Sequence, residues 1–239
     1  MTPAAGPPVG IGDRRLYLCT PARPDLTEFV AACIAGGVDV VQLREKSLDD
    51  KALVQRAEAL VALCRQHQVP FILNDRPDLA LACGADGVHV GQDDCSPTDA
   101  RRIIGEGALI GLSTHEPHQL DAAAGEPVDY VSCGPVAPTP TKPGRPGTGV
   151  GYLYYAAQRT AHPWFVTGGV NPDTVGPMLA AGARRFVVVR WLTEARDPQA
   201  AARKLRIDID GMLKVLDGLT ARAGAPSPPP RRTRRRQTP

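Results

Sequence analysis

The sequence predicts a single α/β domain folded as a closed (β/α)8 TIM barrel, and three observations predict this fold. Eight short apolar runs alternate with segments of helical periodicity, as a barrel of repeated strand and helix units requires. The runs are continuously apolar, which is typical of parallel strands covered on both faces. Neither GxGxxG after the first run nor GxxxxGK[S/T] occurs, which disfavours the open nucleotide-binding sheets.

The strand candidates are short and begin mostly with branched or aromatic residues. They lie at Leu16–Cys19, Val38–Leu43, Phe71–Leu73, Gly87–Val90, Leu109–Leu112, Tyr130–Ser132, Trp164–Thr167 and Phe186–Val189. Between them, apolar residues at helical spacing predict helices most clearly over Leu48–Gln66 and Pro198–Leu216. Ser96-Pro97 and Asn171-Pro172 each combine an N-cap residue with a proline at the first helical position, which predicts helix starts after the fourth and seventh strands.

Composition and charge exclude several classes of protein. Hydrophobic residues make up 43% and charged residues 22%, enough for a large aliphatic core, whereas an aromatic fraction of 5% disfavours a base-stacking surface. The formal net charge is +3, but five arginines lie in the last nine residues, and removing them leaves −2 for the rest. Nucleic-acid binding is therefore expected only through this tail, if at all, and a small anionic ligand fits better.

The chain is expected to form one barrel domain between two disordered ends. Residues 1–13 are rich in Pro and Gly, and residues 221–239 combine Pro with an Arg run, whereas residues 14–220 carry the barrel pattern. Six cysteines without a CxxC or Cys/His spacing are expected to be reduced and mostly buried. With no long apolar run and no signal-peptide pattern, we expect a cytoplasmic protein, and a homo-oligomer is compatible with the sequence.

Polar residues follow nearly every predicted strand, where a closed barrel builds its active site. A single polar residue after a strand is more often part of a solvated loop. The evidence for a site is that such residues occur at the same end of nearly every strand. If the barrel forms, all seven groups project into one mouth: Gln42-Leu43-Arg44-Glu45-Lys46, Asn74-Asp75-Arg76, Gly91-Gln92-Asp93-Asp94, Ser113-Thr114-His115, Thr139-Pro140-Thr141-Lys142, Gly168-Gly169 and Val189-Arg190.

Two aspartates are candidates for a metal site. Asp75 and Asp94 follow adjacent predicted strands, so their carboxylates can converge on one hard cation, for which Mg²⁺ is the natural candidate. The alternative is that Asp75 caps a helix starting near Pro77 and Asp94 caps the helix at Ser96-Pro97.

Cations and glycines in the same mouth favour a phosphorylated ligand. Arg44, Lys46 and Lys142 could, together with a divalent ion, offset the charge of a diphosphate, although surface pairing with Glu45 is the alternative. Gly168-Gly169 would let the backbone approach a phosphate after the seventh strand, although a plain turn also explains it.

The histidines are less promising as catalysts. His89 lies inside an apolar strand and is expected to be a core or barrel-layer residue, not a base. His115 and His118 are expected in a loop and at a helix start. A Ser/His/Asp or Cys/His arrangement is not evident, so we do not expect a protein nucleophile.

Taken together, the motifs resemble the thiamine-phosphate synthase family over about residues 14 to 215. The resemblance rests on QLREK at 42–46, ND at 74–75, GQDD at 91–94, ST at 113–114, PTPTK at 138–142, Gly168-Gly169 and a VV pair near the eighth strand. It implies a transferase of thiamine biosynthesis. This enzyme would condense 4-amino-2-methyl-5-hydroxymethylpyrimidine diphosphate with 4-methyl-5-(2-phosphoethyl)thiazole, or its carboxylated form, to give thiamine phosphate and pyrophosphate.

The resemblance also implies roles for individual residues. The pyrimidine diphosphate would contact Gln42, Leu43, Arg44, Glu45, Lys46, Asn74, Ser113 and Lys142, of which Arg44, Lys46, Ser113 and Lys142 would be catalytic. The thiazole phosphate would contact Thr139, Pro140, Thr141, Gly169, Val189 and Arg190. Asp75 and Asp94 would bind one Mg²⁺ per subunit. Arg190 replaces the serine usual in the family, although an arginine near a phosphate is physically reasonable.

Two other functions stay open at this point. The related thiazole tautomerase shares the fold and the phosphate site without the metal and diphosphate residues, so the presence of Asp75, Asp94 and Lys46 disfavours it. A ligand-sensing or nucleic-acid-associated protein could instead use the Arg-rich tail for salt-dependent phosphate binding. The synthase reaction would need only positioning and electrostatic stabilisation of the leaving diphosphate.

Overall fold

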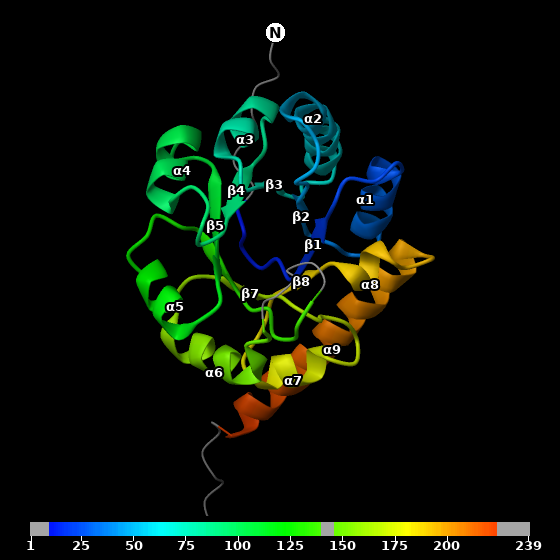
Figure 1. Ribbon diagram of the computed structural model, residues 1–239. Coiled ribbons are helices and arrows are strands. Elements are labelled where there is room, and N and C mark those ends of the chain that lie inside the picture. The colour runs from blue at the N-terminus through cyan, green and yellow to red at the C-terminus, as the bar shows by residue number, and fades with distance from the viewer. Residues whose placement is uncertain (1–9, 140–145, 224–239) are drawn as a thin grey trace, which may run out of the picture.

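Eight parallel strands close into a barrel surrounded by helices in the computed structural model, which describes residues 10–139 and 146–223 (Figure 1). The strands are β1 (Leu16–Thr20), β2 (Val40–Leu43), β3 (Phe71–Asn74), β4 (Gly87–Val90), β5 (Leu109–Thr114), β6 (Tyr130–Cys133), β7 (Trp164–Val166) and β8 (Phe186–Val188). Each strand pairs with the next, and β1 pairs with β8. The predicted (β/α)8 barrel is confirmed.

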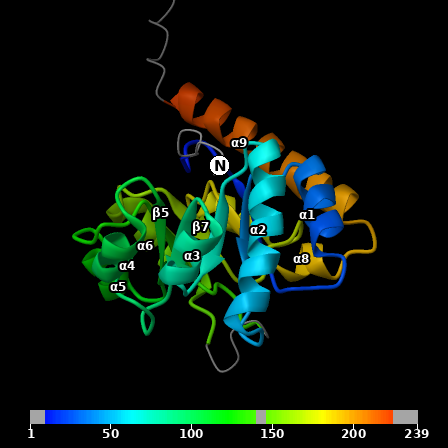
Figure 2. The same ribbon diagram turned by 90° about the horizontal axis from the view of Figure 1, so that it is seen from above.

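The helices form an outer ring around the strands (Figures 1 and 2). They are α1 (Leu26–Ala35), α2 (Asp50–Gln66), α3 (Pro77–Cys83), α4 (Pro97–Ile104), α5 (Pro117–Ala123), α6 (Gly149–Arg159), α7 (Val175–Ala180), α8 (Arg190–Thr193) and α9 (Pro198–Ala223). None of them, within the part of the chain that the structure describes, is long and apolar enough to cross a bilayer.

One of the two predicted helix starts is confirmed and the other is wrong. Ser96 caps α4, because its hydroxyl accepts a hydrogen bond from the backbone amide of Asp99 at 3.1 Å. After β7, by contrast, the Asn171 side chain accepts from the amides of Asp173 and Thr174 at 2.8 and 3.2 Å. This local turn uses the capping oxygen before a helix can form, so α7 begins only at Val175.

The barrel has one apolar core inside the strands and another between strands and helices. The inner core consists of Ile11, Tyr17, Val40, Ile72, Leu109, Tyr130 and Phe165. Phe165 meets both tyrosine rings edge-on, with centroid distances of 5.2 Å to Tyr17 and 5.5 Å to Tyr130. Ile11, which lies within the segment predicted to be unstructured, is 4% exposed and belongs to this core. Inward positions further along the strands are polar, and they build the site.

The cysteines are free thiols, as predicted. Five of them are buried, and Cys95 is partly exposed. Burial raises the pKa of the Cys33 and Cys64 thiols to about 12, so both remain protonated at neutral pH.

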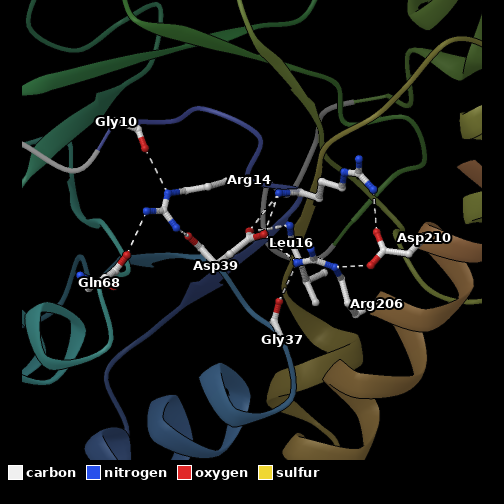
Figure 3. Close-up of polar contacts among 9 residues, drawn as sticks. Gly10, Arg14, Leu16, Gly37, Asp39, Gln68, Arg206 and Asp210 are labelled. Carbon is white, nitrogen blue, oxygen red and sulfur yellow. Dashed lines mark hydrogen bonds and ion pairs between the residues drawn. The ribbon is translucent and has the colours of Figure 1, made fainter.

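A partly buried carboxylate connects three elements where the strands begin (Figure 3). Asp39, just before β2, accepts hydrogen bonds from the backbone amides of Arg15 and Leu16 at 2.8 to 3.0 Å and pairs with Arg206 of α9 at 2.7 Å. Burial raises the pKa of Asp39, and these donors oppose that rise. Arg206 also pairs with Asp210 at 2.8 Å. Asp39 therefore connects the start of β1, the start of β2 and the last helix.

Replacing Asp39 should destabilise the whole domain. We expect Asp39→Ala to lower the free energy of unfolding by about 3 kcal/mol, because two backbone amides and Arg206 lose their acceptor. Urea unfolding measures this. The control is Arg102→Ala, whose exposed side chain pairs with Asp99 and should change stability by less than about 0.5 kcal/mol. Similar losses in the two variants would contradict the role of Asp39.

Candidate active site

A cavity of about 450 Å³ opens where the strands end, a volume within the usual range for small-molecule sites. Strands contribute Cys19, Gln42, Asn74, Ser113 and Ser132, and the loops after β7 and β8 form another side of the cavity. The predicted site residues that line it are Gln42, Arg44, Asn74, Ser113, Thr139, Gly169, Val189 and Arg190. The structure therefore brings together residues spread over most of the chain.

Alternation along β2 decides which residues of the QLREK motif face the cavity. Gln42 and Arg44 line it, whereas Leu43 between them is fully buried in the core beneath the helices. Successive side chains of a strand point to opposite faces. The predicted contact between Leu43 and the pyrimidine substrate is therefore not expected from its side chain.

Glu45 organises the loop that follows β2. Its carboxylate accepts hydrogen bonds from the backbone amides of Lys46 and Ser47 at 2.8 and 2.7 Å, from the Ser47 hydroxyl at 2.6 Å and from the Ala22 amide at 3.2 Å. The Ser47 hydroxyl lowers the pKa of Glu45, so the carboxylate stays ionised. Glu45 thus holds the loop that carries Arg44 and Lys46 against the end of β1.

Lys46, Asp75 and Asp94 form a charged cluster next to the cavity. Lys46 Nζ lies 2.8 Å from Asp75 Oδ2. Burial raises the pKa of Asp75, Lys46 lowers it, and the neighbouring Asp94 carboxyl raises it. Asp94 Oδ2 also accepts from the Gly91 amide at 2.8 Å. The two predicted metal ligands therefore lie close enough to interact, beside Asn74, which lines the cavity.

The alternative helix-capping roles of the two aspartates are wrong. The N-cap of α3 is Arg76, without a side-chain capping bond, and the N-cap of α4 is Ser96. Asp75 instead adopts a left-handed backbone conformation, with φ of 65°, and its amide donates to the carbonyl of His89 at 2.8 Å. A non-glycine residue in this region is uncommon, although aspartate tolerates it better than most.

The loops after β7 and β8 form the side of the cavity predicted to hold a phosphate. Gly168 and Gly169 both have positive φ, at 93° and 78°. A Cβ on Gly168 would lie 2.5 Å from Pro135 Cβ, so only glycine fits there. Arg190 is exposed at the start of α8 and lines the cavity beside Val189. Pro140, Thr141 and Lys142 lie outside the described residues.

Sequence reasoning missed several polar residues of the cavity. Tyr17, Cys19 and Ser132 line it, and His89, expected in a core or barrel layer, is buried and also lines it. His89 Nε2 lies 2.9 Å from the Ser113 hydroxyl. These residues lie within apolar runs. Because side chains alternate along a strand, counting every second residue would have indicated that they point into the barrel.

The closed parallel barrel and its strand-end cavity, with cations and carboxylates at its rim, define a (β/α)8-barrel enzyme with its site at the C-terminal mouth. A family model described as thiamine monophosphate synthase matches residues 16–192. The chain belongs to the thiamine monophosphate synthase family, as the motifs predicted. It is a transferase that forms thiamine phosphate in thiamine biosynthesis.

Individual relatives agree with this assignment. The chain is 47% identical over 207 residues to the thiamine-phosphate synthase of Thermus thermophilus. The match covers 83% of this chain and 98% of the relative. It is 50% identical over 198 residues to the thiamine-phosphate synthase of Thermobifida fusca, covering 80% and 90%. A solved structure of thiamine phosphate pyrophosphorylase from Pyrococcus furiosus matches with a TM-score of 0.77 and 27% identity, covering 84% of this chain and 98% of that one.

Proposed function

We propose that the cavity binds hydroxymethylpyrimidine diphosphate and thiazole phosphate side by side and joins them with release of pyrophosphate. The observation that carries this proposal is the cluster of Lys46, Asp75 and Asp94 beside a cavity whose strands contribute uncharged polar side chains. A diphosphate suits the charged cluster, and a neutral heterocycle suits the buried polar wall.

The pyrimidine ring would bind on the wall formed by β2, β3 and β5. Gln42, Asn74 and Ser113 are 5%, 9% and 4% exposed, so the ring would lose its water when it reaches them. Arg44 and Lys46 follow directly after β2 and would hold the diphosphate, joined by Lys142. Glu45 would act indirectly, by fixing their loop.

The donor set at Asp75 and Asp94 fits Mg²⁺ bound together with a diphosphate. Among the described residues, no group of three or more His, Cys, Asp or Glu side chains could hold a metal. Two carboxylates leave most of an octahedral shell to water and phosphate oxygens, as is usual for Mg²⁺ at phosphate sites. One ion per subunit would neutralise charge on the leaving pyrophosphate. It would also offset the burial and the neighbouring Asp94 carboxyl, which both raise the pKa of Asp75.

The chain's own residues would do the remaining work by position and charge. Arg44, Lys46 and Lys142 would stabilise the negative charge that grows as the bond from the methylene carbon to the diphosphate breaks. The buried wall would hold the pyrimidine so that the thiazole nitrogen faces this carbon. A protein nucleophile is not needed, because the thiazole nitrogen forms the new bond.

The thiazole phosphate would bind at the loops after β7 and β8. Gly169 and Val189 would bring backbone close to the phosphate. Thr139 lines the same cavity and would also contact it, and the family resemblance adds Pro140 and Thr141. Arg190, exposed on the cavity rim, would add a cation for the phosphate or for the carboxylate of the carboxylated thiazole. The tautomerase alternative has no use for the Lys46, Asp75 and Asp94 cluster.

Other expectations stay predictions. These are the cytoplasmic location, a homo-oligomeric assembly and the absence of nucleic-acid binding outside the arginine-rich tail. Of the ends predicted to be disordered, Ile11 packs in the core and α9 extends to Ala223, whereas residues 1–9 and 224–239 lie outside the described residues. Small-molecule substrates are consistent with the family.

The direct test mixes the two substrates with the full chain and Mg²⁺. We expect pyrophosphate and thiamine phosphate to appear together in equal amounts. Pyrophosphate without thiamine phosphate, or neither product, would count against the proposal.

Removing either metal ligand should abolish most of the turnover. We expect Asp75→Ala and Asp94→Ala each to lower kcat by about a hundredfold or more, because the departing diphosphate loses its counter-charge. Asp93→Ala, in the same loop as Asp94, is the matched control and should retain activity. Undiminished turnover of the unmodified enzyme in a chelator without added metal would refute the metal's role.

Arg190 should act on one substrate only. We expect Arg190→Ala to raise the KM for thiazole phosphate roughly tenfold, the loss of one hydrogen bond to a charged group, with little change in the KM for the pyrimidine diphosphate. Arg102→Ala is the control, because Arg102 lies on α4 and does not line the cavity, and it should change neither KM. Unaltered kinetics for both substrates would remove Arg190 from the site.

A further inference from the structure

A run of hydrogen bonds crosses the barrel interior beneath the cavity. It starts at β1, where the Cys19 thiol donates to Gln42 Oε1 at 2.9 Å. Gln42 Nε2 then donates to the Tyr17 hydroxyl, also at 2.9 Å. The Tyr17 hydroxyl lies 3.0 Å from the Tyr130 hydroxyl on β6.

The same run continues to the pyrimidine wall of the cavity. The Tyr130 hydroxyl lies 3.2 Å from His89 Nδ1, and His89 Nε2 lies 2.9 Å from Ser113 Oγ. His89 and Ser113 are 7% and 4% exposed, and both line the cavity. Gln42, the second residue of the run, and Ser113, the last, are both residues that the proposed function assigns to the pyrimidine substrate.

The direction of each bond follows from the number of protons that each group carries. Tyr17 accepts from Gln42, and among the described residues the acceptor within reach of its own proton is the Tyr130 hydroxyl, so we assign that proton to the bond with Tyr130. Tyr130 accepts that bond and therefore directs its own proton to His89 Nδ1. In a neutral imidazole, the nitrogen that accepts carries no proton. His89 then holds its proton on Nε2 and donates it to Ser113 Oγ.

Two features of the interior support this direction. Burial raises the pKa of both Tyr17 and Tyr130, so each phenol keeps the proton that it has to donate. Gly111 of β5 leaves room for the contact, because a Cβ there would lie 2.4 Å from His89 Nδ1 and 2.2 Å from Tyr130 Cζ. The close approach of imidazole and phenol therefore depends on the glycine between them.

We propose that this directed run makes His89 a positioning residue, held as the neutral Nε2–H tautomer, and orients Ser113 as a hydrogen-bond donor to the pyrimidine substrate. Ser132 also donates to Ser113 Oγ, at 3.4 Å. Both bonds use the Ser113 oxygen as acceptor, so the hydroxyl proton is directed away from His89. Ser113 thus selects an acceptor atom of the ligand, such as a ring nitrogen or a phosphate oxygen. The ligand part of this inference rests on the proposed function.

The tautomer can be read without substrate by nitrogen NMR of the full chain labelled at its five histidines. His89→Asn identifies the His89 signals. At neutral pH we expect His89 to show a protonated Nε2 and an unprotonated Nδ1. A proton on Nδ1, or on both nitrogens, would overturn the proposal.

A matched pair of tyrosine variants tests how the tautomer is fixed. Tyr130→Phe removes only the hydroxyl that donates to His89 Nδ1, and we expect the Nδ1–H tautomer to become populated. Tyr152→Phe is the control, because Tyr152 is also buried but donates to Thr114 at 2.7 Å and lies outside the run. It should leave the His89 signals unchanged. Equal spectra for Tyr130→Phe and the unmodified chain, or equal changes in both variants, would overturn the proposal.

Kinetics then separate this inference from the proposed function. We expect Tyr130→Phe to raise the KM for the pyrimidine diphosphate roughly fivefold, the loss of one oriented hydrogen bond, with the KM for thiazole phosphate unchanged. An unchanged pyrimidine KM would refute the effect on Ser113. If the unmodified chain forms no thiamine phosphate, the proposed function fails, while the NMR result still decides the tautomer.

Discussion

Closure of the sheet by the pairing of β1 with β8 is the constraint on which the rest of the structure depends. Tyr17 of β1 stands opposite Val40 of β2 on one side and Val187 of β8 on the other. In a closed sheet, every second residue of every strand must point into the same narrow interior. Successive side chains of each strand therefore alternate between the barrel interior and the layer beneath the helices.

This sorting explains how a buried interior can be both stable and polar. Toward the strand starts, the inward positions are large and apolar and fill the barrel. Toward the strand ends they become Gln42, Asn74, His89 and Ser113. Buried polar groups are costly unless they are hydrogen-bonded, and the run from Cys19 to Ser113 meets that need. Gln42, His89 and Ser113 are thus available to a ligand and are hydrogen-bonded within this run in its absence.

The sequence predicted most of what depends on strand order and less of what depends on side-chain direction. Apolar runs located the eight strands, and adjacency of the third and fourth strands placed Asp75 near Asp94. The QLREK motif did not show that the Leu43 side chain points to the core, because a motif is a continuous segment whereas the side chains of a strand alternate. Asn171 was taken as a helix cap because a local Asx turn and a cap use the same side chain. The run of bonds through Tyr17 and Tyr130 joins residues 113 positions apart, which no local pattern can show.

The charged cluster and the buried run meet at the pairing of β3 with β4, which connects two chemically different parts of the site. Asn74 stands opposite His89 in the register, and the Asp75 amide donates to the His89 carbonyl at 2.8 Å. The left-handed turn at Asp75 sends its carboxylate to Lys46 while its backbone remains bound to the strand that carries His89. A shift of β4 would therefore displace both Asp75 and the imidazole beside Ser113. Because one pair of strands carries both, the groups that would bind the diphosphate and those that would bind the ring keep a fixed separation, as a reaction at the carbon between ring and diphosphate requires.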